Sequence, residues 1–160
     1  MKKILVMSDS HRNLMNMRKA VRIEKPDMII HLGDFYEDAM KLLGEFPKIP
    51  MEAVNGNCDY DQLHTEKLIT VEGKKIFMCH GHFHNVKSGY LTLEYAALEK
   101  GADVALFGHT HRIFYDNHNH LHMLNPGSIG APRAPGGPTY GLLIIENGQI
   151  FIQTCFLDMM

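Results

Sequence analysis

The sequence predicts an α/β fold in which two β-sheets pack together with helices on the outside. Five short apolar runs have the length and composition of buried strands. Two helical patterns alternate with the first three runs, which favours a parallel β-α-β-α-β unit with right-handed crossovers. The last third of the chain reads as strands alone, so we expect one parallel-rich sheet and one antiparallel sheet.

Each of the five apolar runs is followed by Asp, Asn or His, with a glycine close by. In α/β sheets, ligands collect in the crevice outside the carboxyl ends of the strands. We therefore expect the polar groups after the runs to meet in one place. On extended backbone, His109 and His111 would project to the same side. The runs are residues 4–7, 28–30, 52–54, 76–78 and 104–107.

Three segments have helical spacing of apolar residues, with capping residues at their ends. They are residues 14–24 with Asn13 as N-cap and Pro26 as the stop, residues 37–43 ended by Gly44, and residues 88–100 with Ser88 as cap.

The remaining strands are expected at residues 67–71 and 75–79, which form a hairpin, and at residues 113–116, 121–124, 140–146 and 149–156. Asn147-Gly148 joins the last pair as a two-residue turn. His118, His120 and His122 alternate, so we place them on one strand face, exposed or at a subunit contact.

The bulk composition bounds the class of protein. The 160 residues suit one domain spanning 1–160, and 45% hydrophobic residues suffice for a core. A net charge of −2 gives no footprint for nucleic acid. No apolar stretch approaches the roughly 20 residues that span a bilayer, and no signal peptide precedes the first strand. We expect a cytoplasmic protein. Three cysteines without CxxC spacing argue against disulfides and a zinc knuckle.

Seven polar residues at the strand ends offer carboxylate, amide and imidazole ligands. Such a set suits two adjacent divalent metals that share one carboxylate, and Asp34 is the natural bridge. A mixed nitrogen and oxygen set favours Mn, Fe, Co, Ni or Zn. Two metals can polarise a phosphoryl group and lower the pKa of a bridging water. The seven are Asp9, His11, Asp34, Asn57, His80, His109 and His111.

These residues also carry a family resemblance. Five motifs, in order from Met1 to about Gly130, resemble those of the calcineurin-like metallophosphoesterases, and the length and Cys58 resemble the small bacterial and archaeal YfcE-type phosphodiesterases. The motifs are Asp9-x-His11, Gly33-Asp34-x-x-Glu37, Gly56-Asn57-Cys58-Asp59, His80 beside Gly81, and Gly108-His109-x-His111.

The resemblance implies an αββα sandwich, a centre of two metals and hydrolysis of phosphoric esters. It places Asp9, His11, Asp34 and His111 on one metal, and Asp34, Asn57, His80 and His109 on the other. It also implies in-line attack of the bridging water on phosphorus, with His80, His109 and the metals stabilising the developing charge. Each ligating histidine should have an acceptor for its other ring nitrogen.

One position departs from the family pattern. Many members have histidine where this chain has Cys58, and a thiol is a poor proton donor near pH 7. His82, close to a predicted ligand, is an alternative acid, and the role of Asp59 stays open. For Arg12 and Arg133, the sequence favours neither a contact with phosphate nor a place on the exposed surface over the other.

Three functions are weighed. The first is a phosphodiesterase acting on a small phosphate ester or a nucleotide. The second is a scaffold that works through protein contacts, as does the metallophosphoesterase-like subunit of retromer. That subunit departs from the metal motifs, whereas all seven ligand positions are filled here. The third is nucleic-acid processing, which the charge disfavours. The substrate, the native metals and a homodimer are left open.

Overall fold

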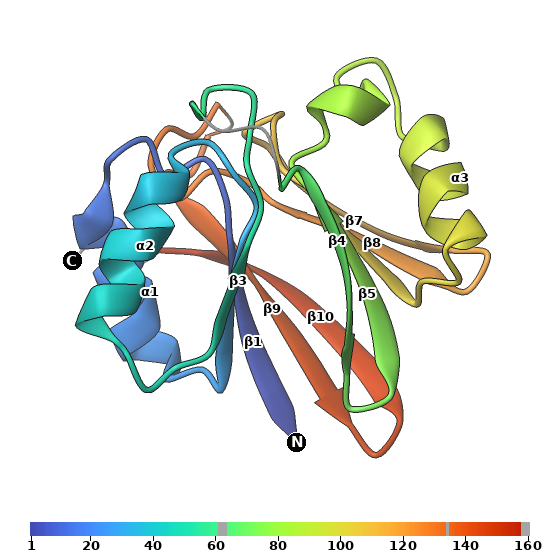
Figure 1. The fold of residues 1–160 in the computed structure, drawn as a ribbon, viewed down its shortest axis with the longest axis horizontal. Helices are drawn as coiled ribbons and strands as arrows, with labels where there is room; N and C mark the ends of the chain where they lie inside the picture. The colour runs from blue at the N-terminus through green and yellow to red at the C-terminus, as the bar shows by residue number, and fades with distance from the viewer. Residues whose placement is uncertain (61–63, 134, 158–160) are drawn as a thin grey trace.

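The structure is a computed structural model that describes residues 1–60, 64–133 and 135–157. Two five-stranded sheets face each other, with α1 and α2 on one side and α3 on the other (Figure 1). In chain order the elements are β1 (Lys2–Met7), α1 (Leu14–Glu24), β2 (Met28–His31), α2 (Tyr36–Glu45), β3 (Met51–Ala53), β4 (Glu66–Val71), β5 (Lys74–Cys79), the short 3-10 helix η1 (His82–His84), α3 (Leu91–Glu99), β6 (Val104–Leu106), β7 (Ile113–His118), β8 (Leu121–Pro126), β9 (Thr139–Glu146) and β10 (Gln149–Phe156).

Both sheets are mixed, so the expected division into a parallel-rich and an antiparallel sheet is wrong. The first sheet has the order β10-β9-β1-β2-β3, with β1, β2 and β3 parallel and β9 antiparallel to β1. The second has the order β4-β5-β6-β8-β7, with β5, β6 and β8 parallel. The strands of the last third are divided between the sheets, with β9 beside β1 in the first and β8 beside β6 in the second. Both β1 and β6 are apolar strands that such a neighbour can flank.

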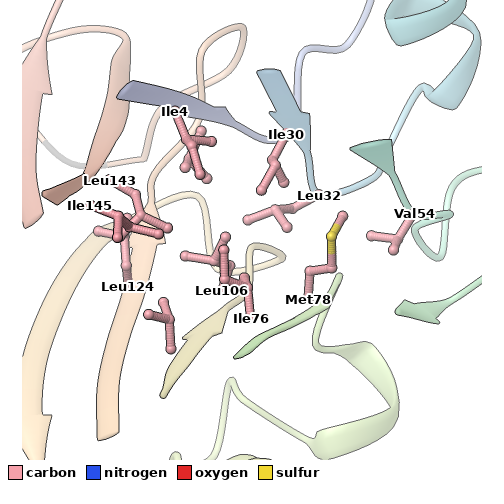
Figure 2. Close-up of a cluster of buried hydrophobic side chains, with 12 residues drawn as sticks. Ile4, Ile30, Leu32, Val54, Ile76, Met78, Leu106, Leu124, Leu143 and Ile145 are labelled. Carbon is pink, nitrogen blue, oxygen red and sulfur yellow. The ribbon is translucent and has the colours of Figure 1, made fainter. Parts of the chain in front are cut away.

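The main core lies between the two sheets (Figure 2). Alternate residues of β1 serve different layers, since strand side chains alternate between faces. Ile4 and Val6 point between the sheets, while Leu5 and Met7 pack under α1. Phe77 of β5 and other outward residues of the second sheet pack under α3. The layers are therefore helix, sheet, sheet and helix, as predicted.

The helix boundaries agree with the sequence only in part. The Asn13 side chain accepts a hydrogen bond from Asn16 N at 3.1 Å, which confirms it as the N-cap of α1. Gly44 does not end α2, which continues to Glu45. α3 begins at Leu91 rather than Ser88, because Gly89 has φ +146° and interrupts any helix between them.

The three alternating histidines do not share a strand. His118 ends β7, His120 lies in the turn and His122 is on β8. Asn119 and His120 both have positive φ, 54° and 61°, which is the backbone of a tight two-residue hairpin turn. Within the described ranges, no helix is long and apolar enough to cross a membrane.

Candidate metal centre

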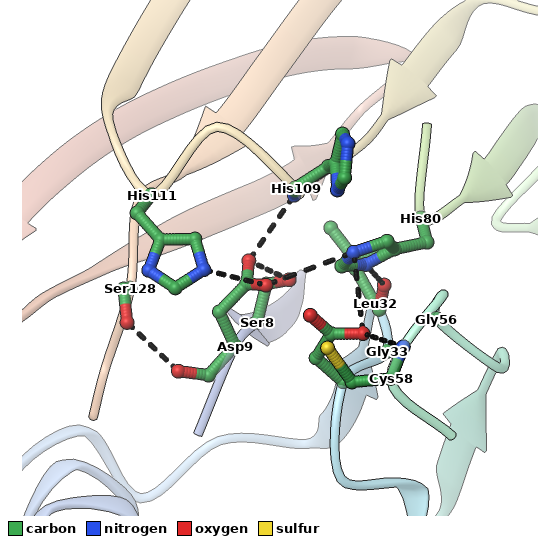
Figure 3. Close-up of polar contacts among 12 residues, drawn as sticks. Ser8, Asp9, Leu32, Gly33, Gly56, Cys58, His80, His109, His111 and Ser128 are labelled. Atoms are coloured by element: carbon green, nitrogen blue, oxygen red, sulfur yellow. Dashed lines mark hydrogen bonds and ion pairs between the residues drawn. The ribbon is translucent and has the colours of Figure 1, made fainter. Parts of the chain in front are cut away.

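The carboxyl ends of strands from both sheets meet at one site (Figure 3). From the first sheet, β1 leads to Asp9 and His11, and β2 leads to Asp34. From the second sheet, β5 leads to His80, and β6 leads to His109 and His111. The site therefore straddles the seam between the sheets.

Asp9 is fully buried at the centre of this site. Its Oδ2 accepts hydrogen bonds from Ser8 Oγ at 2.8 Å and from His109 N at 3.2 Å. Its Oδ1 has no hydrogen bond among the described residues. Three imidazole Nε2 atoms face this oxygen, those of His111 at 3.2 Å, His80 at 3.7 Å and His11 at 4.0 Å.

The hydrogen bonds of two of these rings determine which nitrogen is free. His80 Nδ1 donates to Leu32 O at 2.7 Å, and His111 Nδ1 donates to Ala131 O at 2.6 Å. When neutral, each ring then presents an unprotonated Nε2 to Asp9 Oδ1. Lone pairs of nitrogen and a carboxylate oxygen repel unless a cation lies between them. The orphaned Asp9 Oδ1, His11 Nε2 and His80 Nε2 therefore fit a metal ion.

Asp34 lies between the two groups of histidines. Its Oδ2 is 3.9 Å from His11 Nε2, and its Oδ1 is 3.5 Å from His80 Nε2. Cys58 N donates to the same Oδ1 at 2.8 Å. Burial opposes ionisation, but the hydrogen bonds and charge of His80 and the contact with Cys58 hold the pKa of Asp34 well below its usual range.

One predicted set of ligands is compact. The ligand atoms of Asp9, His11, Asp34 and His111 all lie within 4.8 Å of one another, which is close enough for one ion to reach all four. Of the other predicted set, the rings of His80 and His109 lie 5.1 Å apart. Asn57 is exposed on the turn after β3.

The charge state of the histidines differs across the site. Burial disfavours protonation of His80, yet the contact with Asp34 and the charge of Asp9 outweigh it and raise the pKa of His80. The contact with Asp9 raises the pKa of His111 despite partial burial. Burial, together with the neighbouring His80 and Lys87, lowers the pKa of His109 to about 4. His109 is therefore a neutral imidazole at pH 7.

The backbone at the site is strained, which the sequence did not reveal. Five of the seven predicted ligands have positive φ, a conformation that costs a non-glycine residue of order 1 kcal/mol. The expectation of extended backbone at His109 and His111 is therefore wrong. His109 approaches His80, whereas the His111 ring lies 5.0 Å from that of His11. The five are Asp9 (54°), His11 (45°), Asp34 (57°), His109 (72°) and His111 (62°).

Two glycines are required by close approach to these carboxylates. A Cβ on Gly108 would lie 2.1 Å from Ser8 Oγ and 2.9 Å from Asp9 Oδ2. A Cβ on Gly56 would lie 2.3 Å from Asp34 Oδ1. The glycines that accompany the polar motifs therefore make room for the carboxylates of Asp9 and Asp34.

A buried network behind the site was missed by the sequence reasoning. Asp38, fully buried at the start of α2, accepts from Ser10 Oγ and from Arg12 N, both at 2.7 Å. His31 Nε2 donates to Ser10 Oγ at 3.0 Å, and Gly33 N donates to His31 Nδ1 at 3.2 Å. His31 is therefore a buried histidine with a partner for each ring nitrogen. In the sequence, nothing marks Asp38 as part of the site except its place in the first turn of the predicted helix.

The segment 125–128 supports the site through hydrogen bonds to the backbone around the predicted ligands. Ser128 Oγ donates to Asp9 O at 2.7 Å and accepts from Ala131 N at 2.6 Å (Figure 3). Asn125 Nδ2 donates to Gly108 O at 3.1 Å and to Thr110 Oγ1 at 2.9 Å. These bonds fix the backbone of the residues before and between the predicted ligands.

The residues of the third motif have separate places. Partial burial and the neighbouring Asp34 raise the pKa of Cys58, so its thiol stays protonated. Asp59 accepts from Tyr36 N at 2.6 Å and from Gly56 N at 2.7 Å, which ties the start of α2 to this turn. These two hydrogen bonds give Asp59 a structural role in a chain that has Cys58, rather than histidine, beside it.

His82 lies beside the predicted ligands. Its ring is 5.5 Å from that of His80 and 6.2 Å from that of His109. Burial and the neighbouring His80 lower the pKa of His82. It is therefore neutral at pH 7.

The two arginines lie at different cavities on either side of the site. Arg12, stacked 5.4 Å from the centre of the Phe35 ring, lines a cavity of about 300 Å³ together with Cys58 and Asp59. Arg133 lines another of about 270 Å³.

Comparison with known proteins agrees with this architecture. The model of the calcineurin-like phosphoesterase superfamily domain matches residues 1–148. The chain is 37% identical over 149 residues to the probable metallophosphoesterase YsnB of Bacillus subtilis, covering 90% of this chain and 85% of that protein. It is 30% identical over 167 residues to a phosphodiesterase of Methanocaldococcus jannaschii, covering 92% and 95%.

A solved structure shows the same fold. A protein of Streptococcus pneumoniae, described as a predicted phosphoesterase, superposes with a TM-score of 0.82 at 26% identity, covering 98% of this chain and 90% of that one. The family match, the relatives and the shared fold confirm the resemblance read from the five motifs. The chain belongs to the calcineurin-like phosphoesterase superfamily.

Proposed function

We propose that this chain is a metal-dependent phosphoester hydrolase that acts on a phosphodiester. The observation that carries the proposal is Asp9 Oδ1, a buried carboxylate oxygen without a hydrogen bond that faces three imidazole nitrogens. Divalent ions at such a centre supply charge to stabilise a phosphoryl transition state and lower the pKa of the attacking water.

We assign the ligands as the family resemblance suggests. Asp9, His11, Asp34 and His111 hold one ion, and the compactness of this group supports the assignment. Asp34, Asn57, His80 and His109 hold the second. The intermediate position of Asp34, near both His11 and His80, supports its role as the shared ligand.

The residues around the centre define the proton chemistry. His80 and His109 stabilise charge that develops on the phosphoryl oxygens. Cys58 and His82 border the substrate, but neither is a strong acid near pH 7, because the pKa of the thiol is raised and that of the imidazole is lowered. We therefore expect preference for leaving groups that depart without a proton.

The mixed nitrogen and oxygen ligands support Mn, Ni, Fe, Co or Zn as the ions. The substrate class is a small phosphate ester or a nucleotide rather than a nucleic-acid polymer. One domain over 1–160 and a cytoplasmic location belong to the same proposal.

The test compares bis(p-nitrophenyl) phosphate with p-nitrophenyl phosphate as substrates. Protein stripped with chelator is reloaded with Mn²⁺, Ni²⁺, Zn²⁺ or Mg²⁺. We expect metal-dependent hydrolysis, faster on the diester, and a loss of about 100-fold or more in Asp34→Asn, since several kcal/mol of charge stabilisation disappear.

Asp116→Asn, an exposed aspartate of β7, is the matched control and should keep full activity. Full activity in Asp34→Asn, or turnover that persists after the ions are removed, would contradict the proposal. Hydrolysis of the monoester alone would contradict the preference for a diester.

A further inference from the structure

A second cavity adjoins the candidate metal centre on the side of α3. It has a volume of about 270 Å³ and is lined by Val86, Lys87, Tyr90, Thr110, Arg112 and Arg133. Three of its six residues are cations, and none is acidic. The cavity on the other side of the site differs, because there Arg12 is accompanied by Glu37 and Asp59.

The three cations have no carboxylate partner among the described residues. Among the described residues Lys3, Arg18 and Lys67 form ion pairs with glutamates, whereas most other lysines and arginines form none. Lys87, Arg112 and Arg133 form none, and all three are exposed. Three cations without an acidic residue around one cavity make it a region of positive charge, which favours an anionic ligand.

The cavity is built on the same loop as the predicted ligands. Thr110, which stands between His109 and His111, accepts from Arg112 N at 3.2 Å through its hydroxyl. Arg133 N donates to His111 O at 3.3 Å. Both arginines are thus attached by their backbone to the segment that carries two of the candidate ligands.

The far wall of the cavity is rigid. The Tyr90 ring packs against Phe114 with ring centres 4.3 Å apart and against Phe107 at 5.2 Å. Tyr90 directly precedes α3, so the wall is anchored to a helix that covers the second sheet. A ligand entering the cavity meets a packed aromatic surface on one side and exposed cationic side chains on the other.

We propose that the cavity of Lys87, Arg112 and Arg133 is a subsite for a second phosphate group of the substrate. The preferred substrate is then a phosphodiester that carries an additional phosphate that is not hydrolysed. Guanidinium groups pair with phosphate in two-pronged geometry, and the lysine adds a point charge. This inference rests on the proposed phosphodiesterase function for the identity of the substrate, but the anion site itself does not need hydrolysis.

The first test measures binding without any metal. The chelator-stripped chain is titrated with inorganic pyrophosphate by calorimetry at low ionic strength. We expect the dissociation constant to rise about threefold in Lys87→Gln and in Arg112→Gln, and about tenfold in the double variant. Lys41→Gln, on α2 at the opposite side of the molecule, should bind as the parent does (Figure 1). Binding should weaken as salt is added.

The second test uses two substrates with one leaving group. These are the p-nitrophenyl ester of thymidine 5′-phosphate and the same compound with a 3′-phosphate. We expect the metal-loaded chain to favour the second through a lower KM. The ratio of the two kcat/KM values should fall about threefold in Arg112→Gln and stay unchanged in Lys41→Gln.

The two tests separate this inference from the proposed function. Absence of pyrophosphate binding, or equal binding by the parent and the double variant, would overturn the subsite. A ratio of kcat/KM values unaffected by Arg112→Gln would overturn its role in substrate choice. If the charge variants weaken pyrophosphate binding but no metal gives hydrolysis, the anion site stands and the phosphodiesterase function fails.

Discussion

His31 shows how a single residue can support the candidate centre without facing it. Its ring is fully buried, with Nε2 donating to Ser10 Oγ and Nδ1 accepting from Gly33 N. Both ring nitrogens are thus committed to the neutral form. A proton on Nδ1 would face another donor, so burial and this contact keep the imidazole neutral, and the pKa of His31 is lowered.

This arrangement predicts a pH dependence of stability. An unfolded histidine takes up a proton near pH 6.5, whereas folded His31 does so only at lower pH, so its contribution falls as the pH drops below about 6.5. Between pH 7 and 5.5, the difference in unfolding free energy between the parent and His31→Gln should shift by about 1 kcal/mol against the parent. Urea unfolding of the metal-free chain at several pH values measures this. A difference that is constant with pH would show that folded His31 titrates normally.

At this scale the sequence indicates which residues form the candidate site but not which backbone conformation they adopt. It indicates the candidate ligands because Asp, Asn and His directly follow the apolar runs. It does not reveal the positive φ of Asp9 or His111, because that conformation is imposed by tertiary contacts. Asp38 was also out of reach, since its partners Ser10 and Arg12 become neighbours only after β1 and α2 pack.

At the scale of the element, glycines at different positions have opposite effects on stability. Gly44 lies inside α2, and a Cβ added there would meet nothing within 4 Å. Gly108 follows β6, and a Cβ there would collide with Ser8 and the Asp9 carboxylate. The first glycine weakens its helix, whereas the second permits close approach.

The two substitutions to alanine should therefore have opposite effects. Gly44→Ala should raise the free energy of unfolding by about 0.5–1 kcal/mol, because alanine loses less backbone entropy in a helix. Gly108→Ala should lower it by about 1–3 kcal/mol through overpacking and also reduce metal binding. Chemical denaturation and metal titration of both variants check this. Stabilisation by Gly108→Ala would show that the described contact relaxes freely.

The elements themselves were largely predictable, whereas their pairing was not. The hairpin of β4 and β5 and that of β9 and β10 follow from local turn residues and alternating side chains. The placement of β9 beside β1 depends on contacts between residues far apart in sequence. The local pattern of apolar residues does not indicate which distant strands pair, so the expected separation of parallel and antiparallel strands was wrong.

For the whole molecule, the main consequence is that the candidate centre joins the two sheets. Asp9, His11 and Asp34 follow strands of the first sheet, whereas His80, His109 and His111 follow strands of the second. A bound ion contacted from both sides would link the sheets as well as serve catalysis. Ions that bind only the folded chain must then contribute to its stability.

Removing the metal should therefore destabilise the whole chain. At a metal concentration of about 1,000 times Kd, binding adds about 4 kcal/mol to the free energy of unfolding. Excess chelator should lower the thermal midpoint accordingly, and Asp34→Asn should respond much less. Differential scanning calorimetry measures both. Equal midpoints with and without chelator, in protein shown to bind metal, would contradict an inter-sheet role.

The sheet order also matters while the chain is being made. Ile4 of β1 pairs with Leu143 of β9, which is 143 − 4 = 139 residues later. At synthesis rates of about 5–20 residues per second, the apolar flank of β1 waits on the order of ten seconds for this neighbour. For the later part of that interval the nascent chain displays the edge of β1 that β9 covers in the folded protein. Until β9 emerges, that edge is open to pairing with strands of other chains.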